Sequence, residues 1–237
     1  MVELSDVGVT RHMSESPERH LHDHQPVGHR LPVVLGLIFG VVSLVSLFDP
    51  PAGRFNWFLE LFPAIVGIGV LVVSYRRFPM SPIIYWCVFL HVLILLYGGH
   101  YSHAETPLGN WAKDAFDLNR NHYDRVGHLA LGFFPALIIR EVLLRKTPLR
   151  HGGWLVFIIL SIVLAIAAFW ELLEWWVTLV VAGDVGTAFL GSQGDIWDAQ
   201  WDMFLALVAG AISLFLLSRA HDRSMQAAAI PATQPTG

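Results

Sequence analysis

Phe169-Trp170-Glu171-Leu172-Leu173-Glu174-Trp175-Trp176 places two carboxylates inside a long apolar run. On a helix, Glu171 and Glu174 are three residues apart and share one face. Ionisable side chains at membrane depth are costly, so they usually face a protein interior or a wet cavity and often mark function. The stretch therefore predicts a transmembrane helix whose acidic pair meets partners from elsewhere in the chain.

The composition indicates a polytopic membrane protein. Of the 237 residues, 54% are hydrophobic and only 14% are charged, which is too apolar for an ordinary soluble domain. The single cysteine, Cys87, excludes an intrachain disulfide and a multi-cysteine metal motif. No basic patch or motif indicates nucleic-acid binding. The first 30 residues lack an apolar signal-peptide core, so no cleavable leader is expected.

Six apolar segments each have roughly the ~20 residues needed to cross a bilayer. They are 31–48, 57–75, 82–99, 124–144, 153–182 and 197–218. The expected fold class is therefore an all-α, polytopic integral membrane protein in the lipid bilayer. The polar segments 1–30 and 219–237 are predicted to be disordered. Metal capture by His20-x-His22-x-His24 is the alternative role for the first of them.

Gly36 and Gly40 form a Gly-x-x-x-Gly motif in the first segment. The motif fits either a dimerisation face or close packing within the monomer, and we favour the second because glycine is common in membrane helices. The oligomeric state is left open.

The distribution of Lys and Arg predicts the orientation. With six crossings, both termini share a side, which collects ten Lys or Arg residues against four on the other side. Because positive residues favour the cytoplasm, both termini are predicted to be cytoplasmic. The connections after the first, third and fifth segments then face outward.

Polar residues of several segments converge at that outward level. At ~1.5 Å per residue, Glu171 lies roughly 27 Å along its helix from the inner side. Asp124 and His128 open the fourth segment one turn apart, and Asp198 and Asp202 open the sixth with the same spacing. Glu60, His100 and His103 lie at the same level. His91 is the exception at mid-membrane, and no acid is expected deep in the first, third, fourth or sixth segment.

These residue types limit the chemistry. A histidine with several carboxylates is a ligand set for a divalent cation such as Zn, Mn, Fe or Mg, and His128, Glu174, Asp198 and Asp202 are the expected ligands. The expected catalytic residues are His128, Asp124, Glu171 and Glu174. Without a metal, His128 is the expected general base, oriented by Asp124 or Glu174. Arg125, His100, His103 and Asp195 are the expected substrate contacts. Two outward loops, 100–123 and 183–197, flank the cluster, and loops of such length are often binding segments.

Three stretches carry a family resemblance. They are 119–128, which ends in Tyr-Asp-Arg-Val-Gly-His, the acidic pair Glu171-x-x-Glu174, and 191–203, which contains Gln-Gly-Asp-Ile-Trp-Asp. Together they resemble the YjdF-type bacterial inner membrane proteins over about 30–220. The order of acids and histidine resembles VanZ-like envelope proteins more distantly. Where those typically have an Asn-Gly turn, this chain has Ala199-Gln200-Trp201. The resemblance implies a bacterial inner membrane location and a shared outward polar site, and it implies no particular reaction.

The leading hypothesis is an inner membrane protein that binds or processes a lipid or lipid-linked envelope substrate with a divalent cation. A proton-coupled transporter or channel is the second hypothesis, since the same acids can form a relay. The third is a structural network in which the polar residues only hold the helices together.

Overall fold

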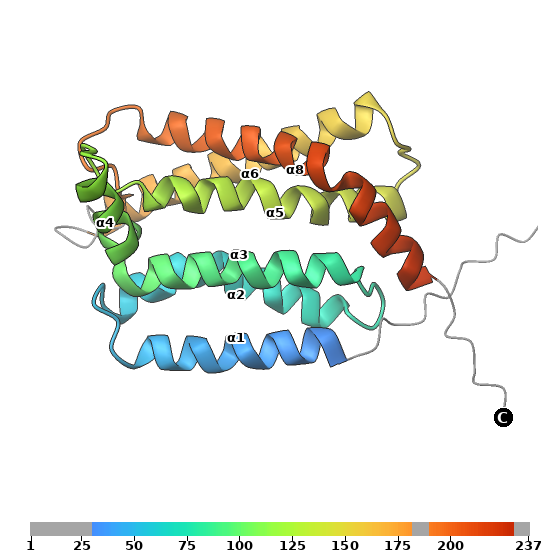
Figure 1. The fold of residues 1–237 in the computed structure, drawn as a ribbon, viewed down its shortest axis with the longest axis horizontal. Helices are drawn as coiled ribbons and strands as arrows, with labels where there is room; N and C mark the ends of the chain where they lie inside the picture. Colours follow the sequence, from blue (N-terminus) through green and yellow to red (C-terminus); the bar gives the residue numbers. More distant parts are fainter. Residues whose placement is uncertain (1–29, 182–189, 230–237) are drawn as a thin grey trace, which may run out of the picture.

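A computed structural model describes residues 30–181 and 190–229. Its long helices are α1 (Arg30–Phe48), α2 (Arg54–Ser74), α3 (Pro82–Tyr101), α5 (Tyr123–Lys146), α6 (Gly153–Val180) and α8 (Asp198–Ala229) (Figure 1). A 3-10 helix (His103–Glu105) and α4 (Pro107–Ala115) lie between α3 and α5. The described residues contain no strand, which confirms the all-α fold class. The predictions for the His20-x-His22-x-His24 run, for 182–189 and for 230–237 lie outside the described residues.

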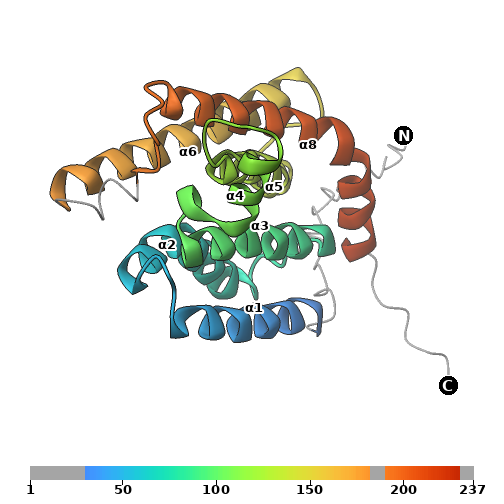
Figure 2. The ribbon, with the colours of Figure 1, turned by 60° about the vertical axis from the view of Figure 1, so that its left-hand side comes forward.

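The six long helices are each long and apolar enough to cross a membrane, as predicted. They form two groups, one of α1, α2 and α3 and the other of α5, α6 and α8, which meet mainly where α3 packs on α5 (Figure 1, Figure 2). The first residue of α1 and the last of α8 lie at one end of the bundle, here called the terminal end. The ends of α1, α3 and α6 and the starts of α2, α5 and α8 lie at the other, here called the site end.

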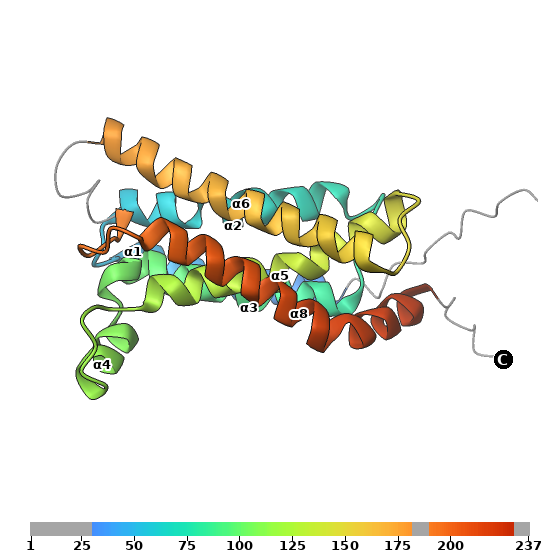
Figure 3. The ribbon, with the colours of Figure 1, turned by 90° about the horizontal axis from the view of Figure 1, so that it is seen from above.

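Helix α6 shows why the acidic pair faces the protein. Its buried apolar residues Ile159, Val163 and Ala167 recur every four positions and form one stripe against the bundle. Such a spacing stays on one helix face, and continuing it by four residues reaches Glu171. The outward residues of α6 are large, apolar and exposed, as expected for a surface against lipid. Toward the site end α6 diverges from α8 (Figure 3).

Helices α5 and α8 cross very closely at Gly132. A Cβ atom built on Gly132 would collide with the backbone of Ala206, so only glycine allows this approach. Small residues at such crossings are typical of membrane bundles. This crossing sets the distance between the two helices that carry Asp124, His128 and Asp202.

We expect Gly132→Ala to destabilise the protein by about 1–3 kcal/mol, because the added methyl group meets backbone that cannot rotate away. Gly67→Ala on α2 is the matched control, since its Cβ would meet nothing within 4 Å, and it should be neutral or slightly stabilising. The thermal unfolding of the two purified variants measures the difference. Equal melting temperatures would contradict the close crossing.

Two expectations are wrong. The helix expected to end at Ser218 continues to Ala229, because polar residues beyond 218 bind other helices. Ser224 Oγ, for example, accepts a hydrogen bond from the backbone N–H of Ile83 at 3.2 Å. The glycines Gly36 and Gly40 do not pack closely within the monomer, since a Cβ at either would meet nothing within 4 Å.

Candidate functional site

The start of α5 holds the first two site residues. Tyr123 N–H donates to Asn121 Oδ1 at 3.0 Å, and the Tyr123 hydroxyl donates to the carbonyl of Ile94 on α3 at 3.0 Å. These bonds fix the first turn of the helix. Asp124 and His128, one turn apart, are consequently buried on the face that α5 turns toward α6 and α8.

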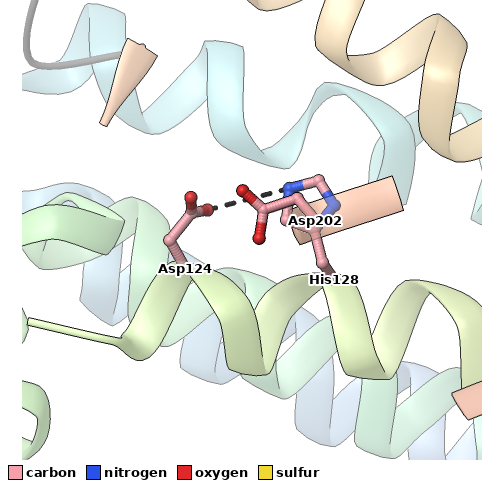
Figure 4. Close-up of side chains that lie close together, drawn as sticks. All are labelled: Asp124, His128 and Asp202. Atoms are coloured by element: carbon pink, nitrogen blue, oxygen red, sulfur yellow. Dashed lines mark ion pairs between the residues drawn. The ribbon is translucent and has the colours of Figure 1, made fainter. Parts of the chain in front are cut away.

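Asp124, His128 and Asp202 form the centre of the site (Figure 4). One ligand atom from each lies within 4.8 Å of those of the other two, and all three residues are buried. Asp202 reaches this point from the first turns of α8. Glu171 of α6 adds a fourth group, with its Oε1 3.3 Å from His128 Nε2, and the Asp124 carboxylate lies 3.9 Å from the same nitrogen. Three helices therefore converge on one imidazole, as the sequence predicts.

Glu174 joins this group electrostatically. Its side chain is buried, and its carboxylate interacts electrostatically with those of Asp124, Glu171 and Asp202. The two glutamates of α6 thus face the same acids, which agrees with their three-residue spacing. We call Asp124, His128, Glu171, Glu174 and Asp202 the central cluster.

Three other acids at the site end are neutralised by basic side chains. Glu60 lies 2.8 Å from His103 Nδ1, and Asp195 lies 2.7 Å from Arg125. Asp198 forms a bidentate pair with Arg120. The four carboxylates of the central cluster have no such partner among the described residues, and only two of them, Asp124 and Glu171, lie within ion-pair distance of His128. Because an isolated buried charge is very costly, this set requires bound protons or a cation.

Several polar atoms of the central cluster are buried without a hydrogen bond. His128 Nδ1, Glu171 Oε1 and Asp202 Oδ1 are buried and have no hydrogen-bond partner in the described parts of the chain. The 3.3 Å approach of Glu171 to His128 is close enough for an ion pair but lacks hydrogen-bond geometry. Buried polar atoms are almost always satisfied, so such orphans suggest an ion or ligand.

The donors of the central cluster are carboxylate oxygens and one imidazole. Zinc accepts nitrogen and oxygen ligands, and oxygen-rich sites also suit Mn or Mg. The residues present therefore fit a single divalent cation. Asp198, an expected metal ligand, is instead bound by Arg120 and belongs to the surrounding shell.

The four expected substrate contacts already have partners within the protein. Arg125 and Asp195 bind each other, and His103 binds Glu60. His100 Nδ1 lies 2.9 Å from the carbonyl of Ser46 and so ties α3 to α1. Their role in binding a substrate stays a prediction.

Residues of two loops complete the shell. Arg120 donates to the carbonyls of Gly191 and Ser192 at 3.1 Å, besides its pair with Asp198. The Gln193 side chain and the Asn121 backbone exchange two hydrogen bonds, of 3.0 and 2.8 Å. Sequence reasoning did not assign these roles to Arg120, Asn121 and Gln193. Two signals were available for them, namely polarity within the loops expected to flank the site and the family resemblance of 119–128 and 191–203.

His103 is packed against α3 and is expected to be charged. Its ring occupies the space that a side chain at Gly98 would need. Burial lowers the pKa of His103, but the Glu60 carboxylate more than reverses this and raises the pKa to about 9. The pair therefore remains ionic at neutral pH.

The His103–Glu60 pair predicts a loss of stability at alkaline pH. Because folding raises the pKa of His103, protonated His103 stabilises the folded state. This stabilisation is complete below the unfolded pKa of about 6.5 and disappears as the pH rises through about 9. The loss amounts to about 3 kcal/mol. Melting temperatures between pH 7 and pH 10 should fall in the wild type and fall much less in Glu60→Gln. An identical pH dependence in both proteins would contradict the assignment.

A second polar cluster lies toward the terminal end and corrects the expectation that no acid lies deep in the fourth segment. Glu141 of α5 is fully buried. It accepts hydrogen bonds from Ser81 N–H and Oγ at 2.9 and 2.6 Å, from Arg145 at 2.7 Å and from His221 at 2.9 Å. Arg140 lies 3.1 Å from His221 and pairs with Asp222 at 2.7 Å. Unlike the central cluster, this one is satisfied, which indicates a structural role.

Comparison with known proteins agrees with this architecture. A family model described as "Predicted membrane protein (DUF2238)" matches residues 31–223. Inner membrane protein YjdF of Escherichia coli (strain K12) is 39% identical over 197 residues, which cover 82% of this chain and 94% of that protein. No solved structure matches. These matches confirm the YjdF-type resemblance and a multi-pass inner membrane protein. The chain belongs to the DUF2238 family of predicted membrane proteins.

Proposed function

We propose that the central cluster binds one divalent cation, with which the protein binds and processes an anionic lipid or lipid-linked molecule of the cell envelope. The observation that carries the proposal is the gathering of three carboxylates, Asp124, Glu171 and Asp202, from three helices around His128. None of the three has an arginine or lysine partner among the described residues. A divalent cation balances part of this charge and uses the donors present.

The position of the cluster supports a lipid-like ligand. Its residues lie in the turns of the membrane-spanning helices nearest the site end, so a ligand that reaches them from the bilayer has an apolar part. The negative charge of the cluster disfavours an anionic headgroup unless a cation bridges the two. A bound cation would polarise a phosphate or ester oxygen. In the processing step, Glu171, which lies beside His128, would accept a proton from water.

Binding of a short-chain prenyl phosphate in detergent tests this proposal. We expect Mn²⁺ or Zn²⁺ to be required for binding, and Asp202→Asn to abolish it. Asp114→Asn, an exposed acid of α4 at the same end, should bind like the wild type. Equal binding in the presence of a chelator would overturn the role of the cation, and failure to bind with the cation present would overturn the lipid substrate.

We also propose that both termini are cytoplasmic and that the site end faces outward. Lys and Arg are concentrated at the terminal end, which favours the cytoplasm. The single native cysteine, Cys87, is buried, so an introduced cysteine can be labelled selectively. A membrane-impermeant reagent added to cells should label Ser192→Cys and leave Arg76→Cys unmodified. The reverse pattern would contradict this orientation.

Proton-coupled transport is the second candidate, and one observation favours it. His91 Nε2 and Ser213 Oγ are buried between the central cluster and the Glu141 cluster, and neither has a hydrogen-bond partner in the described region. Proton flux into proteoliposomes that contain the wild type, together with loss of this flux in His91→Phe, would support this candidate. The absence of flux in the wild type would exclude it.

A further inference from the structure

An apolar groove of about 420 Å³ opens between α1, α2 and α3. Nearly all of its lining is hydrocarbon, contributed by the first turns of α1, the last turns of α2 and the first half of α3. Representative lining residues are Pro32, Leu35 and Gly36 of α1, Leu71 of α2, and Tyr85 and Val88 of α3. The groove lies toward the terminal end, away from the central cluster.

Three arginines flank the groove along the sequence. Arg30 stands two residues before the lining residue Pro32, and Arg76 and Arg77 directly follow the lining residue Tyr75. All three are exposed, and none forms a salt bridge with another residue that the structure describes. The terminal end therefore combines an apolar groove at membrane depth with unpaired positive charge beside it.

We propose that this groove holds an acyl chain of an anionic phospholipid whose phosphate is bound by Arg30, Arg76 and Arg77. The membrane-spanning helices α1–α3 place the lining among acyl chains, where an apolar groove has no other abundant occupant. Basic residues at a helix end attract anionic headgroups. The proposal is independent of the function proposed for the central cluster.

The charge beside the groove favours a phospholipid over a helix of a second copy. A phospholipid supplies an acyl chain for the apolar lining and a phosphate for the three arginines, whereas an apolar helix supplies no anion. The groove has open space at Gly36, since a side chain added there would meet no protein atom within 4 Å of its Cβ.

Competition between two lipids tests the proposal on the full-length protein. The protein is equilibrated in mixed micelles with phosphatidylglycerol and phosphatidylcholine of identical acyl chains, and the bound lipids are counted by native mass spectrometry. We expect the wild type to retain phosphatidylglycerol in preference, by roughly fivefold per arginine at low salt. Gly36→Phe should reduce retention of both lipids. The triple variant Arg30→Ala/Arg76→Ala/Arg77→Ala should retain both equally.

Gly40→Phe is the matched control, because its Cβ also meets open space while Gly40 does not line the groove. It should retain lipid like the wild type, and all variants should keep the wild-type melting temperature within a few degrees. Undiminished lipid retention in Gly36→Phe would overturn the proposal. A preference for phosphatidylglycerol that persists in the triple arginine variant would also overturn it. The same holds if the wild type is a dimer and Gly36→Phe dissociates that dimer.

Discussion

Asp202→Asn is expected to raise the melting temperature of the metal-free protein. Asp202 is one of four carboxylates grouped near a single imidazole. Without a cation, its negative charge either repels Asp124 and Glu171 or must be removed by a bound proton. An amide of the same shape removes this repulsion and can donate a hydrogen bond to a neighbouring carboxylate. A gain of about 0.5–2 kcal/mol is typical when a functional site is relieved of such strain.

Asp198→Asn is the matched control for this prediction. It lies one turn earlier on the same helix and is buried like Asp202, but it is bound by Arg120. Its substitution should lower the melting temperature, because a buried arginine then loses its charged partner. If the central cluster only holds the helices together, both substitutions should destabilise the protein. Opposite signs therefore separate a ligand site from a structural network.

Glu141→Ala is expected to destabilise the protein by about 3–5 kcal/mol, the cost of removing one partner from a buried ionic pair. Glu141 accepts hydrogen bonds from residues of α5, α8 and the start of α3. Its loss leaves Ser81 and His221 Nε2 without this acceptor and removes the carboxylate partner of Arg145. Unfolding of the purified protein by heat or denaturing detergent measures the effect.

Glu105→Ala provides the control for Glu141→Ala. Glu105 is an acid of the 3-10 helix with an exposed side chain, and its removal should change stability by at most about 0.5 kcal/mol. A similarly small effect of Glu141→Ala would show that the second cluster does not hold α3, α5 and α8 together.

The sequence predicts the membrane helices and the centre of the site because both depend on local patterns. Hydropathy over about 20 residues locates each span. The four-residue spacings of Asp124 with His128 and of Asp198 with Asp202 put each pair on one helix face. Because successive crossings alternate in direction, the start of the fourth segment, the end of the fifth and the start of the sixth lie on the same side of the membrane. The convergence on His128 follows from these facts.

Other features depend on which helices are neighbours and cannot be predicted from local patterns. Glu141 lies in an apolar helix, and its burial becomes understandable only because α8 continues past Ser218 and brings His221 to it. In the same way, the sequence predicts Arg125 as a substrate contact and assigns no role to Arg120. The fold of the 190–197 loop determines that Arg120 binds Asp198 and that Arg125 binds Asp195.

The metal content of the purified protein tests the cation site most directly. The protein is extracted from membranes without chelator, equilibrated with Mn²⁺ or Zn²⁺, freed of excess ion and analysed by inductively coupled plasma mass spectrometry. We predict one divalent ion per chain in the wild type and in Asp114→Asn. The ion content should fall more than about tenfold in His128→Ala and Asp202→Asn, since each variant loses a ligand. A wild-type protein without bound ion, or variants that retain it in full, would contradict the proposed site.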